Sequence, residues 1–125
     1  MQVRYPSSWA SLSHPWVRAE LLLTLEELSA ADPREQWVSE RQRKMVSGIN
    51  QVIHFLFDDH GFGEADVGAT LLNRQELALI DALKGELDPI IDERPQGDDN
   101  YFVTHRLWPK VTAAAVAACD AFKRA

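Results

Sequence analysis

INQVIHFLF, residues 49–57, is the most apolar stretch of the chain, and its secondary structure decides the fold class. Its β-branched and aromatic residues are compatible with a helix or with a strand. Ile49, Val52 and Leu56 recur at spacings of three and four, which favours a helix. The alternative is a β-hairpin with VGATLL, residues 67–72. Because no other partner strand is evident in the sequence, we expect an all-α fold.

Helical patterns also lie upstream of this stretch. Pro15, a residue that suits the first turn of a helix, precedes an apolar stripe with spacings of three and four over residues 17–28. A second helix is expected over residues 33–45, with Asp32 as its capping residue. The Ser-Gly pair at 47–48 is expected to interrupt the chain before the apolar stretch begins.

A fourth helix is expected downstream. Asn73 and Glu76 have the spacing of a capping box, and an apolar stripe follows them over residues 77–91. Pro89 lies inside that stripe, so we expect a kink or a restart near Asp88.

The last helix is expected to begin near Trp108, after a loop at residues 95–100. Together the patterns predict a single, compact, bundle-like domain of four or five helices over residues 1–125, with an irregular N-terminal segment at residues 1–12. A length of 125 residues and a hydrophobic share of 46% suit one domain with one core.

The composition also indicates a cellular location. Cys119 is the only cysteine, so no internal disulfide can form. No stretch approaches the roughly 20 apolar residues that span a bilayer, and the N-terminus lacks the apolar block of a secretory signal. We therefore expect a cytoplasmic protein.

Charge is distributed unevenly along the chain, whose formal net charge is −6. Residues 1–45 are neutral overall, residues 46–105 carry three basic and twelve acidic side chains, and residues 106–125 carry four basic and one acidic. A concentrated negative field suits a basic partner. It does not suit nucleic acid or an anionic membrane surface, because phosphate would be repelled.

The acidic residues fall into two groups, each expected at the end of a helix and in the loop that follows. Acids at helix C-termini oppose the helix dipole, so their presence there hints at a binding role. Trp9, in a loose polar segment, is an additional candidate for an exposed aromatic anchor. The predicted partner-binding residues are Asp58, Asp59, Glu64, Asp66, Asp88, Asp92, Glu93, Asp98, Asp99 and Trp9.

Catalytic motifs are weak by comparison. The sequence has no G-x-S-x-G elbow and no phosphate-binding glycine loop. His54 and Asp58 would share a helix face, and with His60 they offer an incomplete metal or acid–base site. Two ligands carry little specificity, so we expect neither a metal nor another cofactor.

Five short segments of the chain resemble a family of small, uncharacterised, largely actinobacterial proteins with no assigned activity. The resemblance covers the chain from about Trp16 onward, although residues 42–51 and the acidic insert after Asp59 depart from it. It implies a common fold and nothing about chemistry, and small families of this type often contain immunity proteins to secreted toxins. The segments are WVSER at 37–41, VIHFLFDD at 52–59, VG at 67–68, LDPIID at 87–92 and WPKV at 108–111.

The sequence therefore predicts a non-catalytic, acidic protein-binding domain. Its most concrete form is a cytoplasmic immunity or inhibitor protein that neutralises a basic toxin such as a nuclease. Two alternatives remain open. One is a small metal-dependent enzyme that uses His54, Asp58 and His60, and the other is a homo-oligomeric structural or regulatory protein.

Overall fold

The computed structural model describes residues 5–45 and 47–125 of the chain. Within these residues it contains six α-helices and no strand, which confirms the all-α prediction. The helices are α1 (Pro15–Ser29), α2 (Arg34–Gln42), α3 (Ile49–Ile53), α4 (Arg74–Glu93), α5 (Asp99–Val103) and α6 (Trp108–Arg124). Two short 3-10 turns, η1 (Ser7–Trp9) and η3 (Glu64–Asp66), and one π-helical segment, η2 (His54–Asp59), complete the secondary structure.

The apolar stretch at 49–57 is helical, so the hairpin alternative is wrong. It forms α3 and continues directly into η2, with Val52, Phe55 and Leu56 buried on one side. Val67 forms only an isolated bridge to Leu71 within the segment that was the proposed partner strand. The three- and four-residue spacing of apolar side chains places one face on the core, which outweighs the β-propensity of the individual residues.

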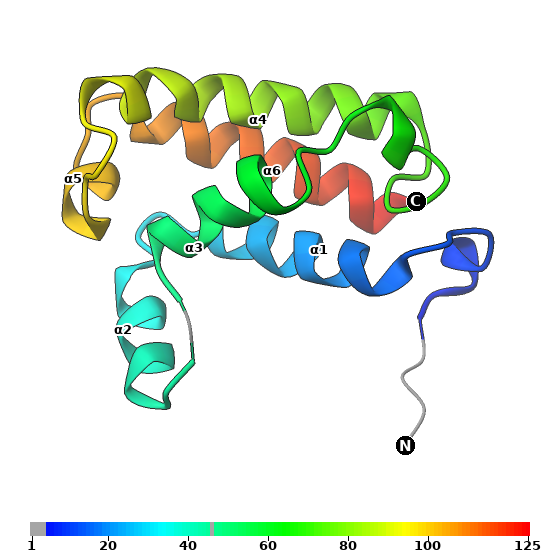
Figure 1. Cartoon of the computed structure of the whole chain (residues 1–125), viewed down its shortest axis with the longest axis horizontal. Coiled ribbons are helices and arrows are strands. Elements are labelled where there is room, and N and C mark those ends of the chain that lie inside the picture. Colours follow the sequence, from blue (N-terminus) through cyan, green and yellow to red (C-terminus); the bar gives the residue numbers. More distant parts are fainter. Residues whose placement is uncertain (1–4, 46) are drawn as a thin grey trace.

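Three long helices build the frame of the molecule. Figure 1 shows α4 and α6 running side by side along the long axis, and α6 packs against α1 as well as against α4. Small residues on α6, among them the buried Ala115 and Ala118, allow this close approach to two neighbours. The core also receives the apolar stripes of α1 and α4 and the aromatic side chains of Trp37, Phe102 and Trp108.

Most of the predicted boundaries are confirmed. α1 begins at Pro15 and α6 at Trp108, and the chain between α2 and α3 turns at Gly48, whose φ of 125° is in the range that favours glycine. The Oδ1 atom of Asn73 accepts a hydrogen bond of 2.9 Å from the backbone N–H of Glu76 and so caps α4. Residues 1–4, part of the predicted irregular segment, lie outside the described residues.

Three boundary predictions differ from the structure. α2 ends at Gln42 and not at residue 45, and its N-cap is Pro33, with no side-chain capping bond, and not Asp32. α4 continues through Pro89 to Glu93 and does not restart near Asp88, because Leu87 and Ile90 are both fully buried and hold the last turns against the core. The short helix α5 begins at Asp99, inside a segment predicted as loop. A five-residue helix has too little apolar periodicity to be recognised from its sequence.

A buried ion pair joins α1 to α4. The guanidinium of Arg18 makes two hydrogen bonds, of 2.6 and 2.8 Å, to the carboxylate of Glu76, and both side chains are almost completely buried. Arg18 also donates to the carbonyl of Thr70, and Glu76 accepts from the backbone N–H of Leu72. The pair therefore fixes the 70–72 segment as well as the two helices.

Aromatic rings cover the guanidinium of Arg18. Its central carbon lies 5.1 Å from the ring centroid of Trp9 and 4.3 Å from that of Phe122 on α6. Trp9 is only 6% exposed, so the prediction of an exposed aromatic anchor at this position is wrong. The N-terminal segment folds back on the core because its tryptophan gains both apolar burial and a cation–π contact there.

We expect Glu76→Gln to destabilise the protein by about 3–5 kcal/mol, because it leaves the charge of Arg18 buried without its counter-charge. Urea unfolding monitored by tryptophan fluorescence measures this loss. The matched control is the double variant Arg18→Met with Glu76→Leu, which removes both charges. It should be much more stable than Glu76→Gln, and a double variant that is less stable than Glu76→Gln would contradict the interpretation.

Among the described residues, no helix has both the length and the apolar character needed to cross a membrane.

Candidate functional site

The acidic residues of the second predicted group are largely engaged within the fold. Asp99 accepts hydrogen bonds from the Arg41 side chain and from the backbone N–H of Ile49, at 2.9 Å each. Asp98 caps α5, so Asp98 and Asp99 lie at a helix N-terminus, where the dipole favours acids. The prediction that they oppose the dipole is therefore wrong. Glu93 bonds to His105 and Arg106, and the hydrogen bond from His105 in particular lowers the pKa of Glu93.

The first predicted group is also partly engaged. Asp66 accepts a hydrogen bond of 2.7 Å from the backbone N–H of Gly63. Glu64 lies 3.5 Å from the guanidinium of Arg74, and both side chains are exposed. These contacts show local structural roles for two residues that were predicted to bind a partner.

Three of the predicted acids, Asp59, Asp88 and Asp92, are exposed and form no ion pair or hydrogen bond with any described residue. The ten predicted partner-binding residues do not form one continuous surface. Glu64 lies beside Arg74 at the start of α4, whereas Asp92 is near its end, about 27 Å away along a helix that rises 1.5 Å per residue. The predicted acidic residues therefore belong to at least two separate surfaces.

The proposed metal or acid–base residues form a weak site. Nδ1 of His54 lies 3.0 Å from the carboxylate of Asp58, but both side chains are more than 60% exposed. The ring of His60 packs against Phe55 and Phe62. In the part of the chain that the structure describes, no group of three or more His, Cys, Asp or Glu side chains is arranged to hold a metal ion.

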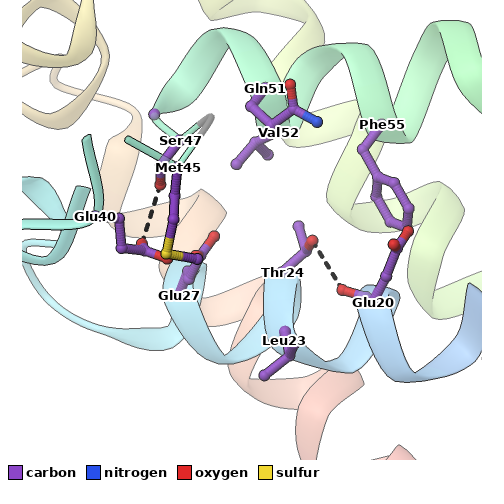
Figure 2. Close-up of a pocket in the computed structure, with 11 residues that line it drawn as sticks. Glu20, Leu23, Thr24, Glu27, Glu40, Met45, Ser47, Gln51, Val52 and Phe55 are labelled. Atoms are coloured by element: carbon purple, nitrogen blue, oxygen red, sulfur yellow. Dashed lines mark hydrogen bonds between the residues drawn. The ribbon is translucent and has the colours of Figure 1, made fainter. Parts of the chain in front are cut away.

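A different acidic site lies between α1, α2 and α3. It is a hollow of about 280 Å³, and Figure 2 shows the side chains that surround it. Glu27 and Glu40 are at one end beneath Met45, and Glu20 is at the other end beside Phe55. Among the described residues, no Lys or Arg lines this hollow.

One wall of the hollow is formed by α1, and the spacing of its residues explains how that wall is built. Glu20, Leu23, Thr24 and Glu27 are spaced by three and four residues, so they share one helix face. The opposite wall comes from the connection between α2 and α3 and from one side of α3. This connection is held in shape because the Arg41 guanidinium donates to the carbonyl of Ser47 and to Asp99 on α5.

The carboxyl groups of Glu27 and Glu40 interact directly. Partial burial, the negative charge of Glu40 and a hydrogen bond with Glu40 together raise the pKa of Glu27 from its ordinary value of 4.5 to about 7. Ser47 donates a hydrogen bond of 3.0 Å to Oε1 of Glu40 and keeps that carboxylate in place (Figure 2). The carboxyl group of Glu27 therefore changes charge near neutral pH.

The indole N–H of Trp37 opposes these effects. It lies beside Glu27 and lowers the pKa of that residue, although its geometry is not that of a normal hydrogen bond. Trp37 is completely buried, and its Nε1 atom has no other partner among the described residues. A buried donor is therefore available to an ionised Glu27.

Apolar side chains extend the site outward. A second hollow shares Leu23, Glu27 and Glu40 with the first and adds Glu26 and Gln36. Leu23 lines both hollows and Met45 lines the first, and their side chains are 62% and 51% exposed. The combination of exposed apolar groups with several carboxylates is typical of a surface that binds a basic, amphipathic partner.

Sequence reasoning missed this site. Glu27 and Glu40 are not among the predicted partner-binding residues, and both side chains are only partly exposed. The available signal was the spacing of Glu20, Leu23 and Glu27, which lie beside the core stripe of α1. The contribution of Glu40 depends on the packing of α2 against α1, which no local pattern in the sequence predicts.

The raised pKa of Glu27 predicts how stability depends on pH. Its protonated form is favoured in the folded state, so the unfolding temperature should fall as pH rises from about 4.5 to about 7. The slope is at most about 1.4 kcal/mol per pH unit, and less because the group is partly solvated. Glu27→Gln should reduce this fall in thermal unfolding measurements, whereas Asp59→Asn should not. An unchanged slope in Glu27→Gln would contradict the assignment.

The chain was also compared with known proteins. No curated protein and no solved structure matches it. One family model, described as a domain of unknown function (DUF7945), matches residues 12–125. This match includes all six α-helices, and the chain therefore belongs to that family.

Proposed function

We propose that this protein is a non-catalytic binding domain whose partner presents a basic segment to the hollow between α1, α2 and α3. The observation that carries the proposal is the composition of the lining. Four glutamates (Glu20, Glu26, Glu27 and Glu40) surround two adjoining hollows, and among the described residues no basic side chain contributes to either. The net charge of −6 has the sign that would attract such a partner.

The shape of the site supports a protein partner. Leu23 and Met45 are exposed beside the carboxylates, so apolar contact and charge complementarity are available at the same place. In such interfaces, charge steers the encounter, while a small buried apolar centre provides most of the affinity.

A toxin with a basic surface, such as a nuclease, is the most concrete partner of this kind. A protein that covers its cleft with carboxylates would occupy the place of the phosphate backbone that the toxin cleaves. The immunity role, the cytoplasmic location expected from composition, and the largely actinobacterial membership suggested by the sequence resemblance are all parts of this proposal. They are not needed for the acidic hollow to bind a basic partner of another class.

The experiment is co-purification of the tagged protein with the products of its neighbouring reading frames, at low and at high salt. We expect a basic partner that high salt releases. The triple variant Glu20→Gln, Glu27→Gln and Glu40→Gln should bind that partner at least about tenfold more weakly, because three carboxylates are lost with little change in shape.

The matched control removes three charges from the surface predicted by sequence alone, through Asp59→Asn, Asp88→Asn and Asp92→Asn. It should keep most of the affinity. Loss of the partner in this control, together with retention in the glutamate variant, would assign binding to the exposed acids and overturn the proposal. Self-association through Leu23 and Met45, seen as a mass that rises with concentration in sedimentation equilibrium and abolished in the glutamate variant, would also overturn it.

A further inference from the structure

We infer that the Glu27–Glu40 carboxyl pair receives one guanidinium group, the end of an arginine side chain on the partner. The aliphatic part of that side chain would lie along Leu23, Met45 and Val52. This inference rests on the proposed function, since it names the group of the basic partner that enters the hollow.

The dimensions of the site suit a single side chain. The hollow of about 280 Å³ is slightly smaller than the range of about 300–1,000 Å³ for ligand pockets. Glu27 and Glu40 lie at one end beside Met45, and the apolar Leu23 and Val52 lie between this end and Glu20 (Figure 2). An extended side chain with an apolar stem and a charged tip matches this arrangement.

The acceptor groups favour a guanidinium. Oε1 of Glu40 already accepts a hydrogen bond from Ser47, which orients the carboxylate while leaving Oε2 available. Glu27 provides a second carboxyl group beside it. A planar guanidinium has five N–H donors in a fixed fork and can bond two carboxylates at once, whereas an ammonium acts as a single compact charge.

A buried donor points independently to an ionised, ligand-bound form of the site. The Nε1–H of Trp37 is completely buried beside Glu27 and lacks a normal acceptor. A cation beside Glu27 would ionise that carboxyl group, and the negative charge would strengthen its attraction for the indole N–H. Cation binding would therefore turn a weak contact of the free protein into a charge-assisted hydrogen bond.

Binding should release a proton to solvent. The titratable groups that line the two hollows with Glu27 are Glu20 and Glu26 on α1 and Glu40 on α2, while α3 contributes Gln51 and Val52 and η2 contributes Phe55, none of which titrates. The charge that acts on Glu27 is the negative charge of Glu40, so below pH 7 Glu27 mostly carries a proton that a cation must displace. The affinity for a guanidinium should then fall up to about tenfold for each pH unit below the pKa of Glu27.

The experiment uses ethylguanidinium as the probe and neutral ethylurea as its control. Glutamate Cδ signals of ¹³C-labelled protein are followed by NMR during pH titrations with and without each compound. Ethylguanidinium should lower the pKa of Glu27, shift the indole N–H signal of Trp37 and bind more tightly at pH 8 than at pH 6. Equal effects of ethylguanidinium and ethylurea, or no effect on Glu27 and Trp37, would overturn the inference.

Two variants separate this inference from the proposed function. Glu27→Gln should abolish the pH dependence of ethylguanidinium binding, and Asp59→Asn should leave it unchanged. Persistence of the pH dependence in Glu27→Gln would overturn the inference.

The two proposals can fail separately. If the basic partner requires the hollow but ethylguanidinium does not bind there, the proposed function stands and the guanidinium site is wrong. If ethylguanidinium binds as expected and no basic partner is found, the site stands and the proposed function fails.

Discussion

The buried ion pair of Arg18 and Glu76 is the interaction on which the rest of the structure depends. It joins α1 to α4, fixes the 70–72 segment through Thr70 and Leu72, and draws Trp9 and Phe122 over the guanidinium. A charge buried to this degree requires its counter-charge, because removing one member of the pair leaves a desolvated charge behind. The pair therefore selects one arrangement of helices from those that an apolar core alone would permit.

The acidic hollow follows from this arrangement. Arg18, Leu21, Leu25 and Leu28 fix the rotation of α1 about its axis, and that rotation turns Glu20, Leu23 and Glu27 toward α2 and α3. Arg41 and Asp99 then hold the connection that brings Glu40 and Ser47 to the same place. Carboxyl groups that repel one another are thus kept together by contacts outside the site. Such an arrangement is expected where a ligand of opposite charge provides the missing compensation.

The sequence predicts the helices better than it predicts the site. Apolar spacing and the positions of Pro15, Asn73 and Trp108 are local signals, and the structure confirms the helix starts that they predict. Arg18 and Glu76 are 58 residues apart, and no local pattern shows that two charged residues will be buried together. The acidic loops stand out in the charge distribution of the sequence, yet Asp98 caps α5 and Asp99 accepts a hydrogen bond from the backbone of α3. The residues that line the acidic hollow come together only where particular helix faces meet, and that is a property of the tertiary structure.

The most direct test of the account is to map the partner's footprint on the ¹⁵N-labelled protein by backbone amide NMR, using the co-purified partner. The account predicts that signal changes concentrate at residues 20–27, at residues 40–48 and on the adjoining side of α3, and that the Trp37 indole signal moves with them. Changes centred instead on Asp59, Asp88 and Asp92, with residues 20–27 and Trp37 unaffected, would contradict the claim that the hollow is the binding site.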